Sequence, residues 1–156
     1  MYNICIAGAA GMGIETIAAI LERRFKRNGY YVFAVRDVMS RVRGGANFIL
    51  LRIDTKPVHS HSYSVDVLAA LNLEGLNLHK DTVNSDGYIL CDTPFGRGND
   101  KIINVEAGRR ARELKAPYVS GSIFAGAILK LFGDSLAQLE EDLKAVLGNH
   151  DIEKNI

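Results

Sequence analysis

Three glycines, Gly8, Gly11 and Gly13, lie within six residues, directly after an apolar run that ends at Ala7. A buried strand followed by a glycine-rich turn and a helix brings several unpaired backbone N–H groups to one point, where the helix dipole adds positive potential. A phosphate or diphosphate is the usual guest of such a turn. The alternative is that these glycines only allow the helix to pack closely against the sheet.

The glycine spacing separates this turn from two better-known phosphate-binding turns. It reads Gly-x-x-Gly-x-Gly, whereas dinucleotide-binding domains carry Gly-x-Gly-x-x-Gly, and no Gly-Lys-Ser/Thr follows it. Asp37 nevertheless follows the second predicted strand, where a ribose-binding acid is expected, although Arg36 beside it weakens that interpretation. An NAD(P)-binding dehydrogenase domain therefore stays open as an alternative.

A second candidate loop follows the same predicted strand. It contains Ser40, Arg41, Arg43, Gly44 and Gly45. Two adjacent glycines can turn backbone N–H groups into an anion-binding concavity, and arginine can hold a phosphate with two parallel hydrogen bonds. Because this loop follows a strand of an open α/β sheet, we expect it near the first glycine turn. Alternatively, it is a surface turn whose arginines are solvated or contact a protein partner.

Strands and helices alternate along the chain. The sequence predicts strands at residues 2–7, 30–35, 47–54, 65–71, 88–91 and 101–105, and helices at 13–28, 76–83, 106–114, 121–132 and 135–147. In the first helix one face is apolar, formed by Ile14, Ile17, Ala18, Leu21 and Phe25. Asp134 or Ser135 is expected to cap the last helix.

Several of the predicted strands are apolar throughout, which is typical of a sheet covered by helices on both faces. We therefore expect an α/β fold, a three-layer α/β/α sandwich with a mostly parallel, Rossmann-like sheet. Residues 1–156 fit a single domain of ordinary size.

Charge is spread unevenly along a chain whose formal net charge is only +1. Residues 22–52 carry eight Lys and Arg against two acids, and residues 134–153 carry six acids against Lys144. A basic first half suggests an anionic ligand or partner there, and solvated helix faces are the alternative explanation. The small net charge argues against a nucleic-acid-binding protein.

The cysteine content and the apolar runs indicate the compartment that we expect. Cys5 and Cys91 both lie in apolar strand-like runs, without a disulfide framework, so a reducing and cytoplasmic location is expected. No signal peptide is recognised. The longest apolar run, residues 118–132, is too short to span a bilayer, so we expect no membrane contact.

Other candidate sites are weaker. His59 and His61 could begin a metal site if they lay on a strand, but no third ligand is evident. A hydrolase that uses Cys91 lacks an exposed turn and a base. Asn72 ends an apolar strand and is a candidate ligand contact or a simple turn residue. The small residues within 121–132 predict a helix packed on the sheet or, alternatively, a subunit contact.

Three segments in order resemble one family. The segments "GAAGMGIETIAAILERRFKRNGYYVF", "SRVRGGANFILLRI" and "DVLAALN" are similar to the gamma domain of the 2-oxoacid:ferredoxin oxidoreductases. Ser40, Arg43, Gly44 and Gly45 match the family's Ser-x-x-Arg-Gly-Gly signature. In the family's Gly-x-Gly-Gly-Gln-Gly turn, Ala10 and Met12 here replace a glycine and the glutamine, which leaves any polar role of that glutamine in doubt.

The resemblance implies an enzyme that oxidatively decarboxylates a 2-oxoacid with coenzyme A and passes electrons to ferredoxin. It implies alpha and beta partner subunits or domains, ferredoxin as an indirect partner, and an α/β gamma module that helps bind coenzyme A and does not catalyse alone. In some members this module is the N-terminal part of the alpha chain. A homodimer is possible as well. The residues that we expect to bind coenzyme A are Gly8, Gly11, Met12, Gly13, Ser40, Arg43, Gly44, Gly45 and Asn72.

The redox chemistry itself must belong to other polypeptide. Two cysteines cannot supply the four thiolates of an iron–sulfur cluster, and no Gly-Asp-Gly segment of the kind used for thiamine diphosphate is present. We therefore expect thiamine diphosphate, Mg²⁺ and the clusters on partner chains or domains. Besides the dinucleotide-binding alternative, a non-catalytic interaction module with purely structural glycines stays open.

Overall fold

The computed structural model of the chain describes residues 1–37, 47–92, 101–148 and 152–155. The predicted strands and helices are present in the predicted order. The elements are β1 (Tyr2–Gly8), α1 (Ile14–Arg27), β2 (Tyr31–Asp37), β3 (Asn47–Asp54), β4 (Val65–Ala70), α2 (Leu73–His79), the 3-10 turn η1 (Lys80–Thr82), β5 (Val83–Cys91), β6 (Ile102–Asn104), α3 (Ala107–Glu113), α4 (Val119–Leu131), α5 (Leu139–Leu147) and α6 (Ile152–Asn155).

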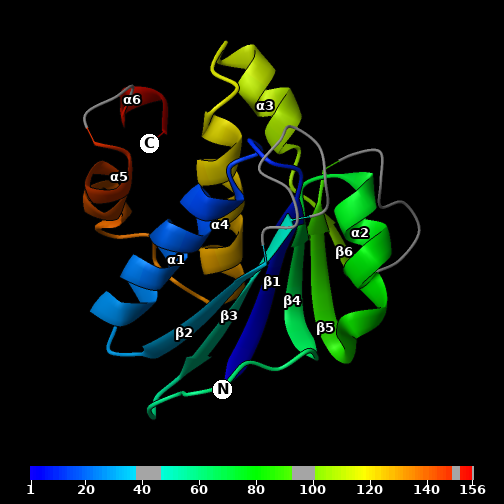
Figure 1. Ribbon diagram of the computed structural model, residues 1–156. Helices are drawn as coiled ribbons and strands as arrows, with labels where there is room; N and C mark the ends of the chain where they lie inside the picture. The colour runs from blue at the N-terminus through cyan, green and yellow to red at the C-terminus, as the bar shows by residue number, and fades with distance from the viewer. Residues whose placement is uncertain (38–46, 93–100, 149–151, 156) are drawn as a thin grey trace.

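The strands form one six-stranded sheet in the order β2-β3-β1-β4-β5-β6. β3 runs antiparallel to both of its neighbours, and the other five strands are parallel to one another, so the expected mostly parallel sheet is confirmed. The nine residues between β2 and β3 are fewer than a parallel crossover needs, which explains the antiparallel step. The five parallel strands all end at one side of the sheet, the upper end in Figure 1, which we call the carboxyl edge.

Helices cover both faces of this sheet, unequally (Figure 1). α1 and α4 pack side by side on one face, α5 packs on α1, and α2 lies on the other face. The predicted apolar face of α1 is confirmed, since Ile17, Ala18 and Leu21 are fully buried and Ile14 and Phe25 almost so. The three-layer architecture therefore follows from the burial of both sheet faces.

Two helices begin away from their predicted positions. α2 starts at Leu73, three residues early, because the Asn72 side chain accepts a hydrogen bond from the Gly75 N–H at 2.8 Å and caps it. α5 starts at Leu139, four residues late, so the expected cap at Asp134 or Ser135 was wrong. Arg24 holds the Asp134 carboxylate with two hydrogen bonds of 2.9 and 3.0 Å, and Gln138 adopts a positive φ at the new helix start.

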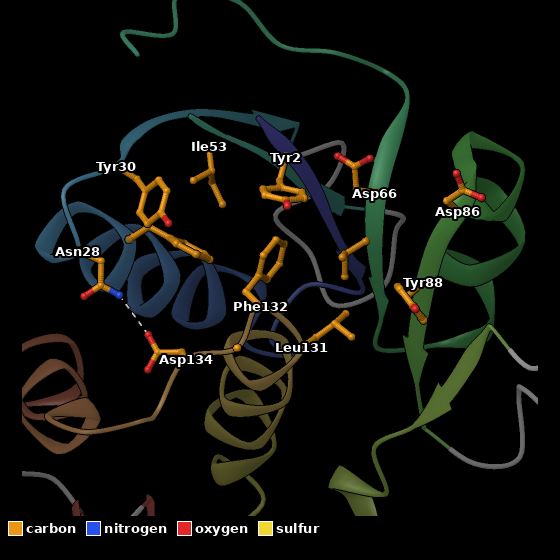
Figure 2. A pocket seen from close by; sticks show the side chains of 13 residues that line it. Tyr2, Asn28, Tyr30, Ile53, Asp66, Asp86, Tyr88, Leu131, Phe132 and Asp134 are labelled. Carbon is orange, nitrogen blue, oxygen red and sulfur yellow. Dashed lines mark hydrogen bonds between the residues drawn. The ribbon is translucent and has the colours of Figure 1, made fainter. Parts of the chain in front are cut away.

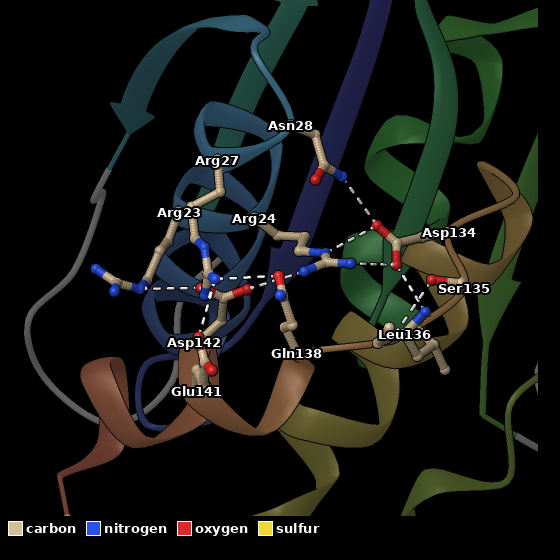
Figure 3. A network of polar contacts seen from close by, with 11 residues as sticks. Arg23, Arg24, Arg27, Asn28, Asp134, Ser135, Leu136, Gln138, Glu141 and Asp142 are labelled. Atoms are coloured by element: carbon tan, nitrogen blue, oxygen red, sulfur yellow. Dashed lines mark hydrogen bonds and ion pairs between the residues drawn. The ribbon is translucent and has the colours of Figure 1, made fainter.

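The uneven charge has an intramolecular explanation, shown in Figure 3. Arg23, Arg24 and Arg27 of α1 point toward the carboxylates of Asp134 and Asp142. Asp142 is fully buried and accepts hydrogen bonds from Arg23 at 3.0 Å and from Arg27 at 2.8 Å. The charge of these three arginines is therefore balanced within the chain, and Arg24 is buried while Arg23 and Arg27 stay partly exposed. We call this set of contacts the arginine–carboxylate network.

Candidate functional site

The glycine turn lies at the carboxyl edge and needs its glycines. Gly11 and Gly13 both have φ near +86°, a conformation that side chains with a Cβ rarely adopt. A Cβ on Gly8 would lie only 3.1 Å from the Leu71 Cβ, since β1 and β4 end close together there. The Met12 N–H donates to the Ala9 carbonyl at 3.1 Å, which closes the turn, and the Met12 side chain packs against the core.

The start of α1 is open. Gly13 occupies the N-cap position and no side chain caps the helix. Among the described residues, no acceptor is paired with the backbone N–H of Ile14 or Glu15, as expected for the first turn of a helix. The Glu15 carboxylate accepts a hydrogen bond from Arg36 at 3.0 Å, so its charge is partly compensated. These N–H groups and the helix dipole favour an anion.

A second long helix begins beside the first. A Cβ on Gly121 of α4 would lie 3.6 Å from the Gly13 carbonyl oxygen, so the two backbones approach closely. α4 has no side-chain cap hydrogen bond at its start. The sequence predicts that small residues pack this helix on the sheet, and Gly121 instead packs against the start of α1. The sequence did not place the helix start near Gly13; the only signal was the small-residue run Ser120–Ser122.

The two short helices at the carboxyl edge are closed by their own neighbours. The Asn72 amide oxygen caps α2, as described above. The Asp92 carboxylate accepts hydrogen bonds from the Ala107 N–H at 2.5 Å and the Gly108 N–H at 2.7 Å, so it caps α3. Within the described ranges, the helix starts at this edge that lack a side-chain cap are therefore those of α1 and α4, and at the α4 start the Val119 N–H already donates to the Ala116 carbonyl at 3.1 Å. Asn72 lies where the sequence predicts, but its amide oxygen is already occupied.

The second candidate loop, with Ser40, Arg43, Gly44 and Gly45, lies outside the described residues. Its expected position can be judged from its flanks. β2 ends at Asp37 at the carboxyl edge, and β3 begins there with Asn47 opposite Gly8. The chain therefore leaves and re-enters the sheet at the edge that holds the glycine turn.

The same strand order argues against a dinucleotide site. Asp37 pairs with Phe48 of β3, and β3 in turn pairs with β1. The acid is thus two strand spacings, roughly 10 Å, from the end of β1. In a dinucleotide-binding fold the acid-bearing strand is the direct neighbour of the glycine-turn strand. The antiparallel β3 occupies that neighbouring place here.

The remaining candidate sites find no support. His59 and His61 are exposed in the loop between β3 and β4 and not on a strand, and the described residues include no group of three possible metal ligands. Burial raises the pKa of the Cys91 thiol, and the charge of Asp92 raises it further, so the reactive thiolate is disfavoured. No helix among the described residues is long and apolar enough to cross a membrane.

A cavity of about 880 Å³ lies at the opposite end of the strands (Figure 2). Aromatic rings of Tyr2, Tyr88 and Phe132 surround it, and the carboxylates of Asp66 and Asp134 lie at its rim. Carboxylates repel a phosphate. An anionic ligand is therefore better placed at the carboxyl edge than in this cavity.

Comparison with known proteins agrees with the resemblance seen in the sequence. The family model described as pyruvate ferredoxin/flavodoxin oxidoreductase matches residues 3–156. The chain belongs to this family. A Sulfolobus 2-oxoacid:ferredoxin oxidoreductase subunit alpha is 34% identical over 74 residues, or 47% of the chain. An Aeropyrum pernix 2-oxoacid:ferredoxin oxidoreductase 1, subunit alpha, is 27% identical over 114 residues, or 70% of the chain. These two matches span only 12% and 17% of the length of the respective relatives.

Solved structures of the family share the fold. A 2-oxoglutarate:ferredoxin oxidoreductase from Magnetococcus marinus, with 2-oxoglutarate, coenzyme A and succinyl-CoA bound, superposes with a TM-score of 0.84 at 21% identity. The superposition covers 99% of this chain and 29% of the Magnetococcus chain. The gamma subunit of a keto/oxoacid ferredoxin oxidoreductase from Geobacter sulfurreducens superposes with a TM-score of 0.77 at 21% identity, over 99% of this chain and 92% of that subunit.

Proposed function

We propose that this chain is the gamma component of a 2-oxoacid:ferredoxin oxidoreductase and binds coenzyme A at the carboxyl edge. The observation that carries the proposal is the pair of helix starts without a side-chain cap, α1 and α4, in a chain that belongs to this family. The superposition with the Geobacter gamma subunit spans 99% of this chain and 92% of that subunit, which supports a gamma-type unit. The structure with bound coenzyme A among its neighbours supports the ligand.

The chemistry of the edge fits the diphosphate of coenzyme A. Backbone N–H groups of the first turn of α1 can donate to phosphate oxygens, and the glycines allow the ligand to approach the backbone. Ser40 and Arg43 would add a hydroxyl and a charged donor from the second loop. Such groups bind and orient a ligand, and none of them forms or breaks a bond.

Decarboxylation and electron transfer belong to partner subunits or domains in this proposal. The chain has two cysteines, both buried, whereas a cluster takes four thiolates. Thiamine diphosphate, Mg²⁺ and the clusters are therefore assigned to the alpha and beta components, which pass electrons to ferredoxin. Two unpaired thiols in the core fit the reducing cytoplasm.

The test is a calorimetric titration of the chain with coenzyme A, dephospho-coenzyme A and NAD(P). Preference for coenzyme A supports the proposal, preference for NAD(P) supports the dinucleotide-binding alternative, and no binding supports an interaction module. Arg43→Ala should weaken coenzyme A binding by about 1.5–3 kcal/mol, the scale of a charge-assisted contact. Lys130→Ala, an exposed change near the far end of α4, should leave the affinity unchanged.

The same proposal predicts that the isolated chain shows no turnover with a 2-oxoacid, coenzyme A and an electron acceptor. Addition of the alpha and beta components should produce activity, and these components should co-purify with the chain. Turnover by the chain alone would contradict the division of labour.

A further inference from the structure

The two outermost strands of the sheet differ in length. β6 forms one edge and has three residues, whereas β2 forms the other and has seven, Tyr31–Asp37. β2 pairs with β3 over its full length without a bulge. Figure 1 shows it as the outermost strand, beneath α1. A long, regular edge strand offers a row of outward backbone N–H and C=O groups, one residue in two.

The outward side of β2 has no partner among the described residues. Among the described residues, its backbone hydrogen bonds go to β3, and its side-chain hydrogen bonds are those of Arg36 to Glu15 and Glu22. Residues 31–35 contain no charge and no proline, although natural proteins commonly protect open edges with lysine, proline or a bulge. Tyr31 is 50% exposed. As far as the structure describes the chain, this edge strand therefore lacks the usual protection against strand pairing.

The side chains of β2 are already placed by the fold. Val32 and Ala34 pack against the core beneath α1, and Val35 packs against the cluster on the other face. The strand is thus held straight while its backbone edge stays open. What remains to be satisfied is a set of main-chain groups, and these select another extended strand as the partner.

We propose that β2 pairs antiparallel with β2 of a second copy of this chain, around a two-fold axis at Phe33. In this register Tyr31 lies opposite Val35 of the other copy, and Val32 lies opposite Ala34. Every residue of the five-residue apolar segment then meets an uncharged residue, so the segment is its own complement.

The charged end of the strand is compatible with this pairing. Arg36 would lie opposite Tyr30 of the second copy, and a guanidinium near an aromatic ring is favourable. Its charge is already balanced by Glu15 at 3.0 Å and Glu22 at 2.5 Å, so the two copies of Arg36 do not repel each other strongly. A strand of another protein that binds through charged side chains would find no charged residue to pair with in residues 31–35. The inference does not depend on the proposed function.

Sedimentation equilibrium tests the proposal directly. The chain should form a concentration-dependent dimer, and Phe33→Lys should raise the dissociation constant by at least about 10-fold, since it sets two like charges opposite each other at the axis. Tyr63→Lys, at a 74% exposed loop position, should not change it. A monomer at about 100 µM, where a micromolar dimer is almost fully formed, would overturn the proposal. So would a dimer that Phe33→Lys leaves unchanged.

A cysteine on the axis gives a second test that does not require a tolerated charge. In an antiparallel pair the opposite Cα atoms lie about 4.5–5.5 Å apart, within the range of a disulfide. Phe33→Cys should therefore cross-link to its own copy under mild oxidation, and Tyr63→Cys should not. The native thiols are buried, with Cys5 at 0% and Cys91 at 1% exposure, and do not compete. Equal cross-linking of both variants would overturn the register.

Discussion

At the scale of single residues, glycine decides where the backbone of the carboxyl edge can run. Gly11 and Gly13 supply the positive φ values of the turn, and Gly121 allows α4 to begin against it. The sequence predicted the first two because three glycines at a strand-to-helix junction form a local pattern. The role of Gly121 could not be predicted, since it depends on a contact between residues that are distant in the chain.

Gly108 provides a direct test of the capping contact at α3. A Cβ at this position would lie 2.8 Å from Asp92 Oδ2, the oxygen that accepts the Gly108 N–H. Gly108→Ala should displace this carboxylate and lower the free energy of unfolding by about 1–2 kcal/mol, the usual value of a helix cap. Urea denaturation measures the change.

The matched control is Gly126→Ala, inside α4, where a Cβ would meet no atom within 4 Å. This variant should be neutral or more stable by up to about 1 kcal/mol, because alanine favours a helix over glycine. A larger loss at Gly126 than at Gly108 would show that the capping contact is unimportant.

At the scale of elements, the arginine–carboxylate network fixes the C-terminal segment onto α1. Asp142 has no exposed surface and contacts Arg23, Arg24 and Arg27. Asp142→Ala removes the buried carboxylate that these three arginines share, leaves Asp134 as the remaining partner of the buried Arg24, and should destabilise the protein by about 3 kcal/mol. The free energies of unfolding of the native chain and of Asp142→Ala, measured by chemical denaturation, test this.

The control for Asp142 is Glu140→Gln, which breaks the exposed ion pair with Lys144 on the same helix. Its cost should stay below about 0.5 kcal/mol. Similar losses for the two variants would mean that burial of Asp142 adds nothing to the docking of α5.

The pairing of Asp134 with Arg24 predicts how the stability of this segment responds to acid. Hydrogen bonds from the Arg24 guanidinium hold the pKa of the Asp134 carboxyl below its ordinary value. A lowered folded pKa gives stability that is present above about pH 4 and is lost as the pH falls through the folded pKa. Unfolding measured from pH 7 to pH 3 should therefore show a shallower acid-side decline for Asp134→Asn than for the native chain. Equal slopes would exclude this coupling.

At the scale of the whole molecule, periodicity and composition predicted the layers of the fold. They did not predict which strands are adjacent in the sheet or which distant side chains make contact. The apolar positions of α1 repeat at helical spacing, so its buried face could be predicted from local sequence. The position of β3 between β2 and β1 depends on strand pairing, for which only the short connection gave a hint. Arg24 and Asp142 are 118 residues apart, so no local pattern signals their contact.

The candidate site was predictable to a similar degree. The glycine turn and its position at the ends of parallel strands follow from a local pattern plus the α/β fold. The open start of α4 beside it required the packing of Gly121 on Gly13. The ligand assignment depends on whether these two helix starts act together on one anion.

Amide chemical shifts recorded by two-dimensional NMR during a coenzyme A titration test this most directly, because weak binding by the lone chain still moves the signals. The account predicts that the N–H signals of Gly13, Ile14 and Gly121 shift together and saturate. Shifts confined to Tyr88 and Phe132, at the opposite cavity, or no shifts at millimolar coenzyme A would contradict it.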